Sequence, residues 1–134
     1  MANALKHAES SVRRWGGKVE DYLPQHIFLD SPKSVMNNNT ARALTHNCWF
    51  VHEVCVKVFG YTIINSDGKK VETIDICMLH ILEDFRHKFI PTAQDYLKHL
   101  VIQPWMNNAV KPIDNEQAYN EAETFKQKLE DGQE

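Results

Sequence analysis

The segment NTARALTHNCWFVHEVCVKVFG, residues 39–60, constrains the fold most strongly, because it has the pattern of one long amphipathic helix. Asn39 or Thr40 can accept hydrogen bonds from its first free N–H groups, and Gly60 can end it in a left-handed conformation. Its apolar residues recur at alternating steps of three and four, the period of a core-facing stripe. They are Ala41, Leu44, Cys48, Val51, Cys55 and Val58. The pattern predicts a domain packed around a single central helix.

The period changes after Gly60. Residues 61–64 and 71–74 are short runs of β-type residues, and Asp67-Gly68 between them is a common hairpin turn. Elsewhere apolar residues recur at helical spacing, which predicts further helices at residues 2–15, 24–30, 76–87 and 92–102. Gly16-Gly17 should stop the first helix, and Pro24 should stand in the first turn of the second. The expected fold class is mainly α: a compact helical domain with one small antiparallel β-hairpin at residues 61–74.

The composition changes again near residue 107. We expect residues 1–106 to form the compact domain and residues 107–134 to form a polar C-terminal extension. A thin apolar stripe in the extension predicts a peripheral helix, which either docks on the body or binds a partner. Its members are Ala118, Tyr119, Ala122, Phe125 and Leu129.

Bulk properties exclude several classes of function. The 134 residues carry a formal net charge of -3, so no basic field attracts nucleic acid. No apolar run approaches the roughly 18 residues that a membrane span requires. The three cysteines show no disulfide framework, and they predict reduced thiols and a cytoplasmic location.

Seven histidines direct attention to three segments that each place a histidine and a carboxylate on one helical face. The groups are His26 with Asp30, His46 with Glu53, and His80 with Glu83, Asp84 and His87. Imidazole nitrogen and carboxylate oxygen bind Zn, Mn or Fe(II), and helical bundles build such sites from facing helices. The competing interpretation is a set of solvated helix faces with ordinary surface pairs.

We therefore consider two sets of candidate site residues. The predicted ligands of a divalent metal ion (Zn, Mn or Fe) are His26, Asp30, His46 and His80. Glu53, Glu83 and Asp84 are the candidates for a catalytic role, as a general base or an additional ligand.

Several pieces of the chain together resemble a family of short uncharacterised bacterial and bacteriophage proteins. They are WGGKVEDYLPQHIFLD, RALTH, FGYTIINSDGKKVETIDI, HILEDF, IPTAQDYLKHL and QPWM, and their order and spacing resemble the family from about residue 5 to residue 106. The resemblance implies a compact, mostly helical domain with one hairpin, and it implies no particular reaction. It also matches the histidine and acidic positions of the family to His26, Asp30, His46, His80, Glu83 and Asp84. Asn47 departs from the family pattern, in which a second histidine usually follows His46.

Two functions from different classes fit these observations. The first is a small metal-binding protein that acts as a metal-dependent hydrolase of a phosphoester. The alternative is a non-enzymatic interaction protein, for example a phage-encoded inhibitor of a host system. In that alternative Trp15, Trp105 and the C-terminal helix would form the working surface, and the histidines would be structural.

Overall fold

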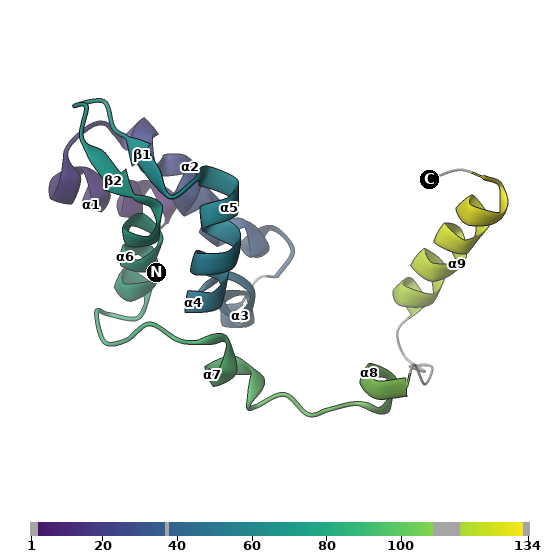
Figure 1. Ribbon diagram of the computed structural model, residues 1–134. Coiled ribbons are helices and arrows are strands. Elements are labelled where there is room, and N and C mark those ends of the chain that lie inside the picture. The colour runs from purple at the N-terminus through teal and green to yellow at the C-terminus, as the bar shows by residue number, and fades with distance from the viewer. Residues whose placement is uncertain (1–2, 37, 109–115, 133–134) are drawn as a thin grey trace. The chain divides into compact units, whose positions relative to one another are not determined.

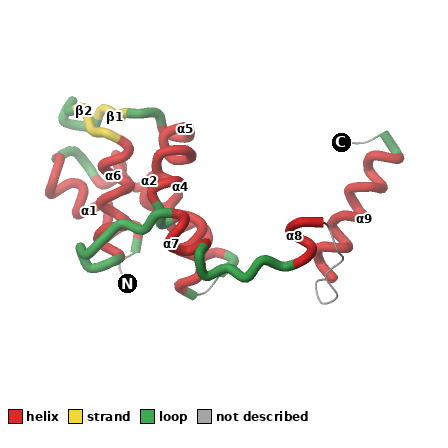
Figure 2. Tube along the Cα trace, turned by 60° about the horizontal axis from the view of Figure 1, so that its bottom comes forward, coloured by secondary structure: helices red, strands yellow, loops and turns green. Residues whose placement is uncertain are grey.

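The computed structural model describes residues 3–36, 38–108 and 116–132, and the chain divides into two compact units. The first unit is Met1–His99 and the second is Leu100–Glu134. Helices dominate both, and β1 and β2 of the first unit form an antiparallel hairpin (Figures 1 and 2). The predicted fold class is confirmed. In the described part of the chain, no helix has the length and apolar character needed to cross a membrane.

Two packed helices open the first unit. Helix α1, Ala4–Trp15, is capped by Asn3 and ends at Gly16, whose φ of 81° explains the glycine. Helix α2 is Val19–Asp30, so the prediction that it starts at Pro24 is wrong. The Asp21 carboxylate accepts from the backbone N–H of Lys18 and anchors an earlier first turn. Pro24 lies on the exposed side of α2, where water can hydrate the carbonyl that it leaves without a donor.

The predicted single helix over residues 39–60 is wrong, because the chain breaks at His46. A 3-10 turn at Asn39–Ala41 and helix α3, Arg42–Thr45, precede the break. His46 adopts φ -94° and ψ 59°, and the Asn47 side chain then caps a new helix by accepting from Phe50 N at 2.9 Å. Helix α4 (Cys48–Phe50), a π-helical segment (Val51–Cys55) and α5 (Val56–Phe59) follow in turn.

The break and the π-helical segment rotate the apolar stripe. Val51 and Cys55 are fully buried as expected, but Leu44 is 54% exposed and Val58 is 56% exposed. Val56 takes a buried position instead, because a π-helical turn contains one extra residue and shifts the face that follows. The predicted end of the segment is confirmed, since Gly60 has a φ of 85°.

The hairpin forms where the sequence predicts it. Strands β1 (Thr62–Ile64) and β2 (Lys70–Glu72) pair antiparallel, with Thr62 opposite Glu72. The Asp21 carboxylate of α2 accepts from Ser66 N at 2.8 Å, which fastens the turn to the helices. Helix α6, Thr73–Asp84, starts directly after β2 and ends before Phe85, so both predicted ends of this helix, residues 76 and 87, are wrong.

Helices α2 and α6 contribute to both hydrophobic clusters of the first unit. One cluster joins them to the π-helical segment, through Leu29, Val51, Cys55, Cys77 and Ile81. The other joins them to α1 and β2, through Ala8, Tyr22, Val71 and Ile76. Packing in the two clusters therefore fixes the sides of α2 and α6 that face each other, and it encloses the polar residues between them.

The remaining helices are short or belong to the second unit. Thr92 and Asp95 form the predicted capping box, but α7 ends at Leu97 (Ala93–Leu97) and does not continue to residue 102. In the second unit, α8 spans Pro104–Asn108 and α9 spans Glu116–Glu130. The Trp105 ring is exposed, whereas the Trp15 ring lies 6.0 Å from the Tyr22 ring. Binding of a partner through these residues stays a prediction.

Candidate metal centre

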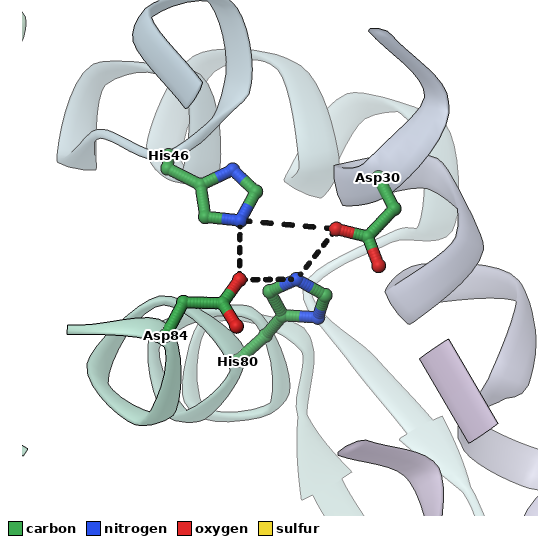
Figure 3. Close-up of side chains that lie close together, drawn as sticks. All are labelled: Asp30, His46, His80 and Asp84. Atoms are coloured by element: carbon green, nitrogen blue, oxygen red, sulfur yellow. Dashed lines mark hydrogen bonds and ion pairs between the residues drawn. The ribbon is translucent and has the colours of Figure 1, made fainter. Parts of the chain in front are cut away.

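Four polar side chains from three helical segments converge inside the first unit (Figure 3). Asp30 is the last residue of α2, and His46 stands at the break between α3 and α4. His80 and Asp84 lie one turn apart on α6. One nitrogen or oxygen atom of each residue lies within 4.8 Å of the corresponding atoms of the other three. The break in the helix therefore positions His46 beside the other three residues.

The distances among the four atoms suit the binding of one metal ion. His46 Nε2 lies 2.8 Å from Asp84 Oδ2 and 3.9 Å from Asp30 Oδ1. His80 Nε2 lies 3.1 Å from Asp30 Oδ1 and 3.3 Å from Asp84 Oδ2. Ligands that each bind one ion at ~2.1 Å are ~3.0 Å apart at octahedral angles and ~3.4 Å apart at tetrahedral angles. Three of these four distances need only small shifts, and His46 and Asp30 must approach each other by roughly half an ångström. The other two pairs, His46 with His80 and Asp30 with Asp84, lie within 4.8 Å.

The cluster is closed to solvent except at Asp30. The side chains of His80, Asp84 and His46 are 0%, 1% and 2% exposed, whereas Asp30 is 12% exposed. At this edge Lys33 Nζ lies 3.3 Å from Asp30 Oδ1. Burial alone would raise the pKa of Asp30, but the hydrogen bonds and charges of His80 and Lys33 together outweigh burial and lower it. Asp30 is therefore an anion at neutral pH.

A threonine hydroxyl fixes the tautomer of His46. The hydroxyl of Thr45 donates to the Leu29 carbonyl at 2.6 Å, and its oxygen lies 3.0 Å from His46 Nδ1. Because its single hydrogen is committed to Leu29, the Thr45 oxygen accepts from His46 Nδ1–H. Burial lowers the pKa of His46 and outweighs the hydrogen bond with Asp84. Once an ion replaces the hydrogen that Nε2 shares with Asp84, the neutral ring presents its Nε2 lone pair to the ion, as a metal ligand does.

His7 of α1 forms an outer layer on Asp84. Its Nδ1 lies 2.8 Å from Glu83 Oε1, and its Nε2 lies 3.1 Å from Asp84 Oδ1, the oxygen that does not face His46. Burial lowers the pKa of His7, but the hydrogen bonds with Asp84 and Glu83 and the charges of these carboxylates together outweigh burial and raise it. Burial would likewise raise the pKa of Asp84, yet hydrogen bonds from His46, His7 and His80 hold it far below its usual range.

His26 also lies in the outer layer. Its Nδ1 is 2.9 Å from Nδ1 of His80, and its Nε2 is 2.8 Å from the Ser11 hydroxyl. Burial, followed by the neighbouring His80 and His7, lowers the pKa of His26 to about 3. His26 is thus a neutral imidazole that supports His80 from behind, and it is outside the group of four converging atoms.

The structure therefore brings together three of the predicted metal ligands, Asp30, His46 and His80, and adds Asp84. Glu83 joins indirectly, by accepting from His7. Glu53 does not join, because its side chain is 55% exposed and pairs with Lys57.

The sequence reasoning missed His7. No carboxylate shares its helix face; its acidic partners, Glu83 and Asp84, lie far along the chain on α6. The available signal was its position beside Ala8 of the predicted core stripe, with Ser11 one turn later on the same side.

Fold and site together define a class: a mainly α-helical domain whose buried histidine and aspartate side chains could hold a metal ion. The chain belongs to the family described as a domain of unknown function (DUF6915), whose model matches residues 2–106. The match includes every residue of the cluster, from His7 to Asp84, and it leaves out α9. The predicted membership of an uncharacterised family is confirmed. No curated protein and no solved structure matches the chain.

Proposed function

We propose that the protein binds one divalent transition-metal ion through Asp30, His46, His80 and Asp84. The observation that carries this proposal is the convergence of four ligand-type atoms within 4.8 Å in the interior of the domain. Two imidazole nitrogens and two carboxylate oxygens suit Zn, Mn and Fe(II). His46 and His80 also have Nδ1 partners, the outer hydrogen bonds that orient metal-binding imidazoles.

The charge of the cluster supports a divalent cation. Asp30, Glu83 and Asp84 supply three carboxylates, and contacts with Glu83 and Asp84 raise the pKa of His7 toward the charged form. Lys33 adds a positive charge at the exposed edge, 3.3 Å from Asp30 Oδ1. Buried anions are costly unless they are paired or bind a metal. The three carboxylates outnumber the two cationic side chains beside them, His7 and Lys33, so the cluster attracts a cation.

Metal analysis of the full chain, purified without a histidine tag, tests the proposal. We expect about one ion per chain, and we expect a chelator to lower the melting temperature, because an ion bound only to the folded state stabilises it. Asp84→Asn and His80→Ala should lose the ion. The control His99→Ala, at an exposed position outside the cluster, should retain it. Metal-free protein whose melting temperature responds to neither chelator nor added zinc or manganese would contradict the proposal.

Hydrolysis of a phosphoester is the reaction that we propose for the loaded centre. Lys33 supports it, because this cation flanks Asp30, the edge of the cluster that solvent reaches, and would attract an anionic substrate. Lys33 and Arg42 also line a small pocket beside His46. A bound divalent ion would polarise a phosphoryl oxygen or an attacking water molecule.

Turnover of bis(p-nitrophenyl) phosphate by metal-loaded protein tests this reaction separately. We expect turnover that Asp84→Asn abolishes and that Lys33→Met weakens while the ion stays bound. Loaded protein without turnover on phosphomonoester or phosphodiester substrates would overturn the hydrolase function and leave metal binding intact.

A further inference from the structure

A buried chain of hydrogen bonds leads from the candidate metal centre to helix α1. His80 Nδ1 lies 2.9 Å from His26 Nδ1, and His26 Nε2 lies 2.8 Å from Ser11 Oγ. The Ser11 hydroxyl donates to the His7 carbonyl at 3.1 Å. Ser11, His26 and His80 are all fully buried. Water therefore does not compete for these bonds, and their direction is set by the groups themselves.

The chain can run toward the carbonyl with every bond made. A carbonyl only accepts, so in this direction the Ser11 hydroxyl donates to His7, and the Ser11 oxygen accepts from His26 Nε2–H. Neutral His26 carries one ring hydrogen, and its Nδ1 is therefore an acceptor. When an ion occupies Nε2, His80 carries its single hydrogen on Nδ1 and donates to His26. In the metal-free protein the hydrogen bonds of Nε2 with Asp30 and Asp84 need a hydrogen there, and the ion replaces it.

We infer that His26 and Ser11 are positioning residues, which hold His80 in the tautomer that can bind the metal ion. This inference rests on the proposed metal function. The opposite direction of the chain would put a hydrogen on Nε2 of neutral His80 and leave no lone pair for an ion. Metal-binding histidines usually donate to a carboxylate, a backbone carbonyl or water. Here the acceptor is an imidazole, and its own tautomer depends on the α1 serine.

The stacking of the rings supports the same role. The His7 ring stacks on the His80 ring with centroids 3.8 Å apart, and the His26 and His80 rings are 5.1 Å apart at 19°. These contacts fix the plane of the His80 ring, whereas the hydrogen bond at Nδ1 selects its tautomer. Loss of that acceptor should therefore weaken metal binding by the 10–100-fold that is typical of outer-layer partners.

Four variants of the full chain separate this role from packing. His26→Leu removes the acceptor for His80, and Ser11→Ala removes the acceptor for His26 without adding bulk. His26→Asn keeps an acceptor oxygen near the position of Nδ1. Ser34→Ala is the control, because its hydroxyl bonds to the Ser31 carbonyl on the exposed surface.

The dissociation constant for zinc is measured by competition with a chromophoric chelator. We expect it to rise roughly 10–100-fold for His26→Leu, to rise less for Ser11→Ala, and to return toward the wild-type value for His26→Asn. Ser34→Ala should match the wild type.

Nitrogen-15 NMR of zinc-loaded, histidine-labelled protein reads the tautomers, which a purely structural role would not fix. We expect His26 to carry its hydrogen on Nε2 and His80 to carry its hydrogen on Nδ1. A hydrogen on Nδ1 of His26 would overturn the inference, even if His26→Leu fails to fold. Wild-type zinc affinity in folded Ser11→Ala and His26→Leu would overturn it as well. Wild-type protein that binds no zinc would overturn the proposed function and this inference together. The other tautomer of His26, or unchanged zinc affinity in the two variants, would overturn this inference alone.

Discussion

Replacement of Thr45 by valine tests how the outer hydrogen bonds support both the fold and the metal centre. The Thr45 side chain is buried, and its hydroxyl joins the Leu29 carbonyl at 2.6 Å to His46 Nδ1 at 3.0 Å. Thr45→Val keeps the volume of the side chain and removes both bonds. Each buried polar group that loses its partner costs about 1–3 kcal/mol. We expect a loss of about 2–4 kcal/mol in the free energy of unfolding of the metal-free protein.

Thr45→Ser is the matched control, because it keeps the hydroxyl and removes only one methyl group. We expect it to cost about 1 kcal/mol. Valine should also release the tautomer of His46 and raise the dissociation constant for zinc by roughly 10–100-fold, whereas serine should leave it near the wild-type value.

Urea denaturation followed by circular dichroism measures the stability of both variants, and competition with a chelator measures their zinc affinity. Equal stabilities for Thr45→Val and Thr45→Ser would refute the assignment of the two hydrogen bonds. Reduced stability with unchanged zinc affinity in Thr45→Val would refute the link between Thr45 and the tautomer of His46.

Two further predictions concern the hairpin and its attachment. Gly68 has a φ of 80° and no atom within 4 Å of an added Cβ, so Gly68→Val should cost about 1–2 kcal/mol through backbone strain alone, and Gly68→Asn should cost less. Equal melting temperatures for the two variants would contradict the turn conformation. Hydrogen bonds from the backbone N–H of Lys18 and Ser66 lower the pKa of Asp21, so its charge stabilises the fold above the unfolded pKa of about 4 and loses this effect as the pH falls. The stability difference between wild type and Asp21→Asn, measured in urea, should shrink from pH 7 to pH 3, and a constant difference would refute the role of the charge.

Local signals explain which parts of the fold the sequence could predict. Gly16-Gly17 and Gly60 end helices because their backbones adopt positive φ, and Asp67-Gly68 turns the hairpin for the same reason. These features depend only on neighbouring residues, so a short window contains the necessary information.

The break at His46 depends on distant residues and was therefore missed. The Tyr96 hydroxyl donates to the His46 carbonyl at 2.9 Å, and Cys48 N donates to the Pro91 carbonyl at 3.0 Å. These groups from the segment around α7 supply the partners that an unbroken helix would have supplied internally. Apolar periodicity continues through the break, and the cap at Asn47 was the only local sign of it.

The sequence predicts which residues of the candidate site share a helix face. It does not predict how these helix faces pack against one another. The spacing of four residues between His26 and Asp30 places both on one side of α2. Spacing does not decide whether that side meets water or another helix, and packing against α1 and α6 encloses it here. The same packing decides that His26 supports His80 while Asp30 reaches the other ligand atoms.

The enclosure of the four ligand atoms also governs how fast an ion can be exchanged. The side chains of His46, His80 and Asp84 are almost completely buried, so an ion leaves only when the ligands on α6 move away from His46 and Asp30. Release must then wait for a local opening, whose rate depends on the stability of the packed helices. The rate at which a chelator strips the protein should reach a plateau as its concentration rises. That plateau would measure how often the helices separate.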